Sequence, residues 1–420
     1  MKDIVNNNIE HVKKDNFINK TFFNKFHCVE KIGEGSFGSI YKAEYKGQYY
    51  ALKIEKIGKN ENLLENEAII MNYLKGPYIP YIKFYGSTSD YNILVMQLLG
   101  RNLENIFEEK KSFSIKTVCM LGYQFVSILE YIHNKHILHR DIKPDNFVMG
   151  LNDLSEYVYL LDFGLAKKYR SSRTLKQIPL VNKRKVVGTT RYASINALKG
   201  FEHSRKDDLE AAGYILIYFI KGKLPWQGIT SKNKVDRYRK LLKSKIETTP
   251  KQLCEGLPEE FEKYISYTRN LEYLEQPDYE MLKGLFTSIL KKTFLKFDYI
   301  YNWTTAEEIS IRRIYSDKNE IESRINNKKS LTSRKLINDN EEDPNKRTFY
   351  MSFDDSKKNL FPKYNCNEDD IYNKNVNNFR KNNKIIENEE AIIFSKRKDY
   401  LNSINSADEA ICCTSECILF

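Results

Sequence analysis

The order of apolar and polar positions divides the chain into stretches of different kind. Residues 27–98 are typical mainly of strands, with one helix near 62–75. Past residue 99 the spacing becomes helical. The clearest case is 114–134, a long amphipathic helix whose apolar face is formed by Val118, Leu121, Phe125, Ile128, Leu129 and Ile132. Residues 209–220 are apolar almost throughout, which predicts a helix that is buried on all sides.

The two ends of the chain differ from this middle part. Residues 1–26 are a polar N-terminal extension rich in Asn and Lys. Residues 304–411 contain no Gly, two Pro and many Asn, Lys, Asp and Glu. Such a composition buries too little apolar surface to fold well, so we expect a disordered tail apart from short helices, for example around 304–326. The folded domain is expected over 27–303, and 412–420 form a separate C-terminal segment.

Charge narrows the classes of partner. The net charge is +12, but 20 Lys and Arg against 21 Asp and Glu make the part from residue 304 on nearly neutral, which leaves about +13 for residues 1–303. A basic folded part favours acidic or phosphorylated proteins, anionic lipid or nucleic acid. Because we find no nucleic-acid motif, we expect no nucleic-acid partner and favour the first class. Binding to DNA or RNA with a steep salt dependence would support the alternative.

The cysteines and the apolar runs indicate the compartment. No apolar run reaches the roughly 18 residues of a transmembrane helix, and residues 1–20 lack the apolar core of a secretory signal. Of seven cysteines, Cys28, Cys119, Cys254 and Cys366 are scattered, without metal-ligand spacing or a disulfide framework. A reducing, intracellular compartment is therefore expected.

Two motifs carry the chemistry. Residues 139–146 read His-Arg-Asp-Ile-Lys-Pro-Asp-Asn, and Asp-Phe-Gly begins at residue 162, sixteen residues after the Asn. They match the catalytic loop and the metal-binding turn of protein kinases in order and spacing. Phosphoryl transfer needs a positioned nucleophile and positive charge around the moving group. Asp141 can accept the substrate hydroxyl proton, and Lys143 can reach the γ-phosphate. Asn146 and Asp162 offer oxygen ligands suited to Mg²⁺.

A glycine-rich stretch upstream supplies the nucleotide-binding part. Gly-Glu-Gly-Ser-Phe-Gly spans residues 33–38, and the β-prone residues after it indicate a hairpin rather than the strand-to-helix loop of dinucleotide-binding folds. Such a hairpin can cover the phosphates of ATP. Residues 50–54 match the strand motif whose Lys53 holds phosphates, and we choose Glu67 over Glu65 as its partner. The expected ATP-binding residues are Ile32, Gly33, Glu34, Gly35, Ser36, Phe37, Gly38, Ile40, Lys53, Glu67 and Leu98.

Further motifs narrow the type of kinase. Residues 188–196 read Gly-Thr-Thr-Arg-Tyr-Ala-Ser-Ile-Asn, with Ser-Ile-Asn where most Ser/Thr kinases carry Ala-Pro-Glu. Together with Leu-Leu-Gly at 98–100, the stretch 204–210 and Leu-Pro-Trp-Gln-Gly at 224–228, this makes residues 27–303 resemble the casein kinase 1 family. The resemblance implies an α+β, bilobal protein kinase fold with a β-rich N-lobe and an α-helical C-lobe. It also implies a monomeric, ATP- and Mg-dependent protein serine/threonine kinase.

The resemblance implies a class of substrate as well. Casein kinase 1 enzymes favour a Ser or Thr that follows a phosphate or an acidic group by three residues, so acidic or pre-phosphorylated protein substrates are expected. The matching substrate phosphate-binding pocket comprises Arg184, Arg191, Gly228 and Arg237. Arginine suits it, because its planar guanidinium binds phosphate bidentately. Solvated surface charges are the alternative for Arg184 and Arg237.

Other positions around the site also match the family or depart from it. The resemblance implies that Met96 lies behind the adenine, that Thr189 hydrogen-bonds near the catalytic Asp, and that Asp208 braces the catalytic loop. Gln97 stands where the family usually has an acidic residue, and Arg101 replaces its usual Pro. Both departures lie at the edge of the adenine pocket, where they bear on inhibitor binding rather than on catalysis.

The last residues predict a lipid anchor. Cys417 opens a C-terminal Cys-Ile-Leu-Phe, which fits the prenylation box, and the final Phe favours a geranylgeranyl group. One prenyl chain holds a protein only reversibly, so a second signal is usual, and Cys412 and Cys413 are candidate palmitoylation sites. We expect a cytoplasmic enzyme held at the cytoplasmic face of a membrane. A free apolar C-terminus and a tethered pseudokinase are the alternatives, and an ATP-turnover assay separates the pseudokinase from an active enzyme.

Overall fold

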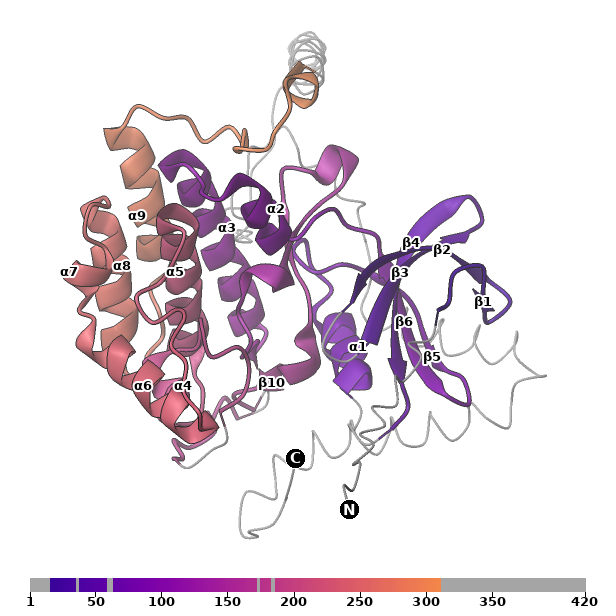
Figure 1. Ribbon diagram of the computed structural model, residues 1–420, viewed down its shortest axis with the longest axis horizontal. Coiled ribbons are helices and arrows are strands. Elements are labelled where there is room, and N and C mark those ends of the chain that lie inside the picture. Colours follow the sequence, from indigo (N-terminus) through magenta and orange to yellow (C-terminus); the bar gives the residue numbers. More distant parts are fainter. Residues whose placement is uncertain (1–15, 35–37, 59–62, 172–173, 183–185, 311–420) are drawn as a thin grey trace, which may run out of the picture. The chain divides into compact units, whose positions relative to one another are not determined.

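The computed structural model describes residues 16–34, 38–58, 63–171, 174–182 and 186–310. Most strands come early in the chain and most helices later, and they form an N-terminal lobe built on a sheet and a helical C-terminal lobe (Figure 1). This is the bilobal α+β architecture that the sequence predicts. The tail from residue 311 on, for which disorder was predicted, and the lipidation segment 412–420 lie outside the described residues.

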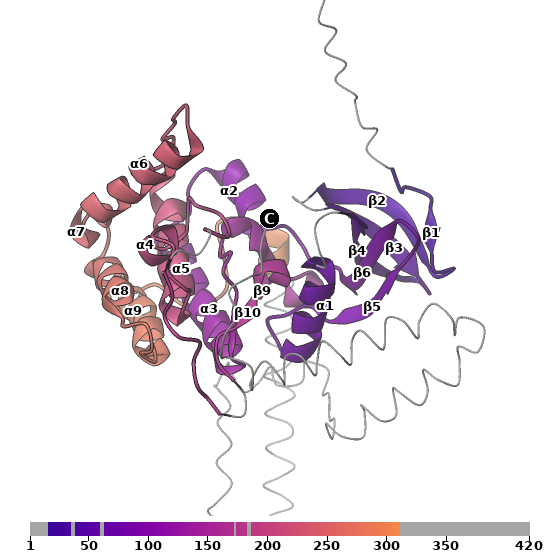
Figure 2. The ribbon, with the colours of Figure 1, turned by 90° about the horizontal axis from the view of Figure 1, so that it is seen from below.

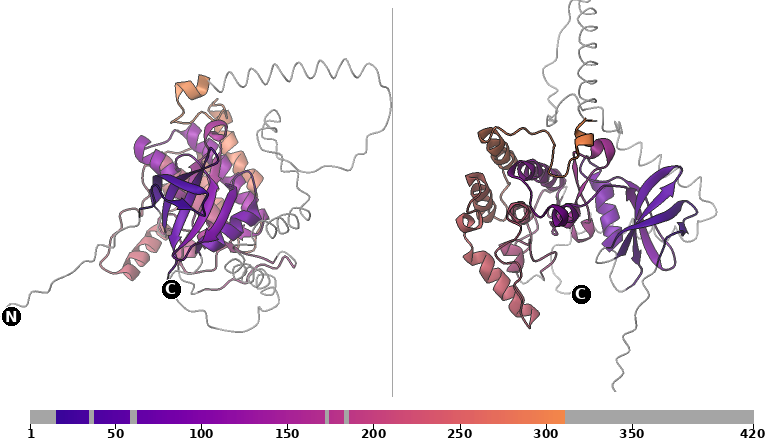
Figure 3. Two further views of the ribbon diagram at one scale, coloured as in Figure 1. Left: turned by 90° about the vertical axis from the view of Figure 1, so that its right-hand side faces the viewer. Right: turned by 45° about the horizontal axis from the view of Figure 1, so that its top comes forward.

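The N-terminal lobe is built on a curled sheet (Figure 3). In the described residues this sheet has six antiparallel strands in the order β1-β2-β3-β4-β6-β5. The strands are β1 (Thr21–Phe22), β2 (Phe26–Glu34), β3 (Gly38–Tyr45), β4 (Gln48–Lys56), β5 (Ile82–Ser87) and β6 (Tyr91–Gln97). Helix α1 (Leu63–Leu74) lies against β5 and β6 (Figure 2). Glu34 pairs with Ser39 across the glycine-rich stretch, which confirms a hairpin. Gly38 is required there, because a Cβ would lie 2.2 Å from the carbonyl oxygen of Ile54.

The packed part of this lobe begins earlier than the predicted boundary at residue 27. Phe17 is buried, its N–H donates to Tyr41 Oη at 3.3 Å, and its ring packs edge-on against Tyr41 and Tyr91. Phe22 and Phe26 join the same apolar cluster. The spacing of these aromatic residues lets a short strand, β1, fold back on β2. Residues 16–26 are therefore part of the folded lobe rather than of a polar extension.

Two long helices form the core of the C-terminal lobe. Helix α3 (Ile115–Asn134) begins after Ser114, whose Oγ accepts the N–H of Thr117 at 3.2 Å, as expected of an N-cap. It packs against α5 (Arg205–Lys221) and α9 (Tyr279–Lys292). Helix α5 is buried along nearly its whole length, as predicted for 209–220. It starts a turn earlier, because the Asp207 carboxylate accepts the N–H of Ser204 at 2.6 Å and caps the helix.

Two small two-stranded sheets carry the segments with the kinase motifs. Strand β7 (Ile137–Leu138) pairs with β10 (Lys167–Lys168), and β8 (Phe147–Met149) pairs with β9 (Val158–Leu160). The catalytic loop joins β7 to β8, and Asp-Phe-Gly follows β9. The C-terminal lobe also contains the α-helices α2 (Leu103–Lys110), α4 (Ile195–Leu198), α6 (Lys234–Glu247), α7 (Pro250–Leu253) and α8 (Glu259–Asn270). Residues 306–310 are helical, within the predicted helix near 304–326.

Candidate active site

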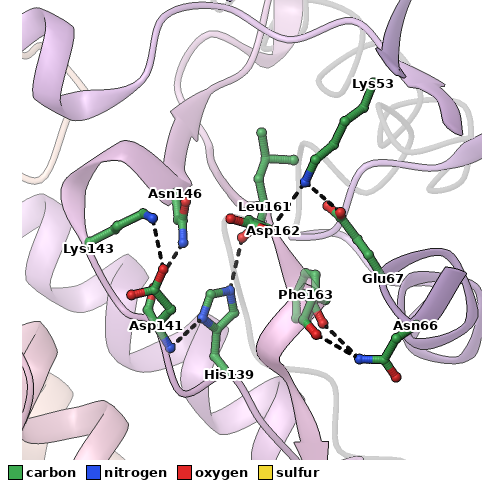
Figure 4. A network of polar contacts seen from close by, with 11 residues as sticks. Lys53, Asn66, Glu67, His139, Asp141, Lys143, Asn146, Leu161, Asp162 and Phe163 are labelled. Atoms are coloured by element: carbon green, nitrogen blue, oxygen red, sulfur yellow. Dashed lines mark hydrogen bonds and ion pairs between the residues drawn. The ribbon is translucent and has the colours of Figure 1, made fainter. Parts of the chain in front are cut away.

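Asp141 lies at the centre of the catalytic loop, beside Lys143 and Asn146 (Figure 4). Both of its carboxylate oxygens are held. The N–H of Thr189 donates to Oδ1 at 2.7 Å, and Lys143 Nζ lies 2.8 Å from Oδ2. Asn146 Nδ2 donates to the main-chain oxygen of Asp141 at 2.9 Å. Burial alone would lower the pKa of Lys143, but the charge of Asp141 outweighs it and raises that pKa. The predicted catalytic residues therefore meet, and Thr189 contributes through its backbone.

A glycine lets the segment after the activation loop reach Asp141. Gly188 has a φ of 77°, in the left-handed region. A Cβ at this position would lie 2.5 Å from the carbonyl oxygen of Arg140 and 3.0 Å from Asp141 Oδ1. Only glycine allows this approach, which places the Thr189 N–H against the carboxylate.

Asp208 on α5 holds the catalytic loop from inside the lobe, as the resemblance implied. Its two carboxylate oxygens accept the N–H groups of His139 and Arg140, each at 2.9 Å. His133 Nε2 lies 3.0 Å from the same carboxylate. Burial would raise the pKa of Asp208, but the hydrogen bonds and the two nearby histidines hold it below its usual value. The loop thus rests on a carboxylate that stays ionised near neutral pH.

The predicted nucleotide-binding charges form a second group. Lys53 Nζ on β4 lies 2.6 Å from Glu67 Oε2 on α1 and 3.2 Å from Asp162 Oδ1 (Figure 4). The choice of Glu67 over Glu65 is therefore confirmed. Burial would lower the pKa of Lys53, but the charges of Glu67 and Asp162 raise it above its usual value. Burial would likewise raise the pKa of Asp162, but Lys53 and Lys143 keep it low. Lys53 and Asp162 are therefore held in their charged forms, whereas burial raises the pKa of Glu67 above its usual value although Lys53 opposes the shift.

The Asp-Phe-Gly turn is fixed by two contacts. The Phe163 ring is buried, with its centroid 5.0 Å from that of His139. Asn66 on α1 donates from Nδ2 to the carbonyl oxygen of Gly164 at 3.0 Å (Figure 4). The sequence motifs do not identify Asn66, and its position next to Glu67 is the only sequence signal that points to it. These contacts orient the Asp162 carboxylate toward Lys53.

The donor set suits ATP with a divalent cation. Asp162 offers a charged carboxylate, and Asn146 uses its amide nitrogen toward Asp141 and so keeps its side-chain oxygen for other contacts. Hard oxygen donors of this kind fit Mg²⁺. On the nucleotide side, Gly33 and Glu34 end β2, Gly38 and Ile40 belong to β3, and Leu98 follows β6. Ile32 is exposed on β2, and the predicted contacts Gly35, Ser36 and Phe37 lie outside the described residues.

The structure brings together only some of the residues predicted for the phosphate pocket. The guanidinium of Arg191 lies 3.8 Å from Glu104 Oε1 and is partly exposed. Trp226 Nε1 donates to the carbonyl oxygen of Arg191 at 2.8 Å, so the loop that contains Gly228 lies next to Arg191. Arg237 is exposed near the start of α6. Arg184 lies outside the described residues.

Three residues behind this pocket were not predicted: Glu210 and Lys245, which are buried, and Arg269, which is half-buried. Glu210 Oε1 accepts the N–H of Ile195 at 3.0 Å, within the Ser-Ile-Asn stretch. Nothing in the sequence distinguishes Lys245 from the other basic residues of α6. The composition of this helix does not reveal which of its basic side chains is buried.

A family model described as the protein kinase domain matches residues 26–293. The match covers more than half of the chain and includes the glycine-rich hairpin, the Lys53–Glu67 pair, the catalytic loop and the Asp-Phe-Gly turn. The protein is a protein kinase, a transferase that uses ATP and a divalent metal ion, and the chain belongs to the protein kinase domain family.

Proposed function

We propose that this kinase phosphorylates Ser and Thr in the manner of casein kinase 1. The observation that carries the proposal is the fixed carboxylate of Asp141, held at 2.7 Å by the Thr189 N–H and at 2.8 Å by Lys143. A carboxylate fixed in this way can accept the proton of an acceptor hydroxyl. Lys143, beside it, can neutralise negative charge on the transferred group.

The residues on the other side of the site would hold Mg·ATP. Lys53 would bind the α- and β-phosphates, and Asp162 and Asn146 would hold Mg²⁺. When bound, Mg·ATP supplies the phosphoryl group that is transferred. Glu67 orients Lys53, and Asn66 fixes the turn that presents Asp162.

The Ser-Ile-Asn triplet supports the narrower assignment. Ser194 Oγ caps α4 by accepting the N–H of Ala197 at 3.0 Å, and it donates to Asp207 at 2.5 Å. The N–H of Ile195 donates to Glu210. The triplet thus ties the end of the activation segment to α5, where most Ser/Thr kinases use Ala-Pro-Glu.

Acidic or phosphate-primed proteins are the substrates we propose. Arg191 is partly exposed beside the Gly228 loop and lies two residues from Thr189, which contacts the catalytic Asp. A phosphate held there would lie a few residues from the acceptor. The test uses four versions of one peptide: Ser, Thr or Tyr as acceptor without phosphate, and Ser as acceptor with phosphoserine three residues before it. We expect Ser and Thr to be used, Tyr to be ignored and the primed peptide to be preferred. Equal use of Tyr would contradict the Ser/Thr assignment, and equal use of both Ser peptides would contradict priming.

Membrane attachment is proposed from the sequence alone, since Cys412, Cys413 and Cys417 lie outside the described residues. Among the helices that the structure describes, none has the length and apolarity to cross a bilayer. Prenylation of Cys417, with acylation of Cys412 or Cys413, would hold the kinase at the cytoplasmic face. Cys417→Ser should shift most of the protein to the soluble fraction without changing activity on peptides, with Cys366→Ser as the matched control. Mass spectrometry that finds an unprocessed Ile418-Leu419-Phe420 end in a soluble wild-type protein would contradict the anchor.

A further inference from the structure

A buried lysine lies directly behind the segment that faces the substrate. Lys245 on α6 has no exposed surface. Its Nζ donates to the carbonyl oxygen of Thr190 at 3.2 Å and to that of Ala193. The ammonium also lies 4.8 Å from the ring centroids of Tyr214 and Trp226. One side chain therefore joins α6 and α5 to two main-chain oxygens of the 189–194 segment.

Trp226 adds a third anchor to the same segment. Its Nε1 donates to the carbonyl oxygen of Arg191 at 2.8 Å. The carbonyl oxygens of residues 190, 191 and 193 are thus all held from the interior. On the opposite side, the N–H of Thr189 contacts Asp141, and the Arg191 side chain reaches the surface. The functional groups face the active site because the carbonyl groups are tied behind them.

The end of α6 that carries Lys245 is itself fixed. Arg269 on α8 donates from Nη1 to the carbonyl oxygen of Thr248 at 2.8 Å and from Nη2 to that of Lys245 at 3.4 Å. The same guanidinium donates to Tyr214 Oη at 3.0 Å. Lys245 therefore projects from a held helix end and not from a free one.

The position is unfavourable for a charge, which argues against simple packing. In the described part of the chain, no carboxylate forms an ion pair with Lys245. Burial lowers its pKa to about 7, which Glu210 opposes and Arg269 reinforces. An apolar side chain of similar length would fill such a site at least as well. What it would lack are the donors for the two carbonyl groups, which would then stay buried without these partners.

We propose that Lys245 is a positioning residue for the protein substrate, which acts by holding the 189–194 segment so that Thr189 and Arg191 face the acceptor peptide. The proposal concerns peptide binding by a protein kinase. It does not depend on the preference for primed substrates proposed above.

The test compares Lys245→Met with Lys243→Met. Lys243 lies on the same helix, is exposed, and contacts Glu247 at 3.6 Å, so the control removes the same charge without touching the segment. In Lys245→Met we expect KM for the peptide to rise about tenfold, as for the loss of one charge-assisted hydrogen bond. KM for ATP and the slow hydrolysis of ATP without peptide should stay within about twofold. Lys243→Met should match the wild type in every constant.

Two outcomes would overturn the proposal. An unchanged peptide KM in a folded Lys245→Met protein would mean that the segment holds its shape without the ammonium. A parallel loss of peptide binding, ATP binding and ATP hydrolysis would mean that Lys245 serves general stability.

A second variant keeps the test decisive if Lys245→Met does not fold. Trp226→Phe keeps an aromatic ring beside Tyr214 but removes the donor to Arg191, so the peptide KM should rise about threefold while KM for ATP stays constant. No change in Trp226→Phe would then count against the proposal. If the wild type itself ignores priming, the substrate assignment fails, yet the peptide KM of either variant still tests the positioning role.

Discussion

The two segments that meet at Asp141 are both tied to the first turns of α5, but by carboxylates in different surroundings. The catalytic loop is held by Asp208, which accepts two backbone N–H groups and contacts His133. Residues 189–195, which we call the substrate-facing segment, are held by two other carboxylates. Asp207 accepts from the Ser194 hydroxyl and caps its own helix, and Glu210 accepts the N–H of Ile195.

The pKa values of these neighbours move in opposite directions. Hydrogen bonds and nearby histidines hold the pKa of Asp208 below its usual value. Burial raises the pKa of Asp207 to about 6 and also raises that of Glu210. A buried carboxylate stays ionised only where enough donors point at it. The catalytic loop therefore rests on a firmly charged anchor, whereas the substrate-facing segment rests on two carboxylates whose pKa values burial raises.

The largest effect should follow from a change where the two segments meet. Asp141→Asn removes the proton acceptor but keeps an oxygen for the Thr189 N–H, so the fold should survive. We expect kcat to fall by about 10²- to 10⁴-fold, the usual contribution of a general base. Steady-state kinetics measure the fall in kcat, and thermal melting checks that the fold survives.

Asp153→Asn is the matched control, because it makes the same chemical change on an exposed turn (residues 152–154). It should leave kcat and the melting temperature as they are. Wild-type turnover in Asp141→Asn would show that another group takes the proton.

The second prediction compares the two anchors directly. Asp208→Ala leaves the N–H groups of His139 and Arg140 without acceptors, which costs about 1–3 kcal/mol each, so the free energy of unfolding should fall by roughly 2–6 kcal/mol. In Asp207→Ala one N–H group loses its acceptor while the Ser194 hydroxyl can rotate, so a loss of roughly 1–3 kcal/mol is expected. Urea denaturation of both variants gives the values. A larger loss in Asp207→Ala would reverse the order of the two anchors.

Much of the site could be predicted because its chemistry is local in sequence. The catalytic loop and the Asp-Phe-Gly turn each place several functional groups within a few residues. The Lys53–Glu67 pair joins two elements. The motif around Lys53 fixed the first partner, and the family distance before Gly76 selected Glu67 on the next predicted helix as the second. The long helix 114–134 followed from its apolar spacing alone, and the structure adds the cap at Ser114.

The features that were missed depend on contacts between distant residues. Phe17 lies in a polar stretch, and only its packing against Tyr41 and Tyr91 reveals that it belongs to the sheet. Lys245 is one of several basic residues on α6, and its inward direction depends on Trp226 and Tyr214 from other elements. A sequence pattern shows which face of a helix is apolar, but it does not show which lysine side chain packs into the interior.

The third prediction concerns the exposed side of the substrate-facing segment. Arg191→Ala with Arg237→Ala should remove most of the preference for a primed peptide, at about 1–3 kcal/mol or less for each partly exposed charge. Activity on an acidic, unprimed protein should change little. The control is Arg239→Ala, which removes an exposed arginine of α6 whose guanidinium lies 3.4 Å from Asp236. Equal losses on both substrates would indicate a folding defect or a misplaced pocket.

The smallest effect tests the titration of the two anchors. The folded-state pKa of Asp207, about 6, lies above its ordinary value of 3.8. As pH rises between these two values, the unfolded chain loses this proton before the folded protein does, so the free energy of unfolding falls. Above about pH 6 the folded protein has lost the proton as well, and the full loss of stability from the raised pKa is reached. Asp208 behaves in the opposite way, because its lowered pKa gives stability that is present above 3.8 and is lost only as pH falls further.

Asp207→Asn removes the titration of residue 207 and leaves that of Asp208. Between pH 5 and pH 7, the free energy of unfolding should therefore fall less in the variant than in the wild type, by roughly 1 kcal/mol for one proton. Urea denaturation at several pH values measures the difference, and Asp153→Asn serves as the exposed control. Other buried carboxylates titrate in both proteins, so they cancel in the comparison. Parallel curves would mean that Asp207 is as firmly ionised as Asp208, and the two segments would then be held by equally charged anchors.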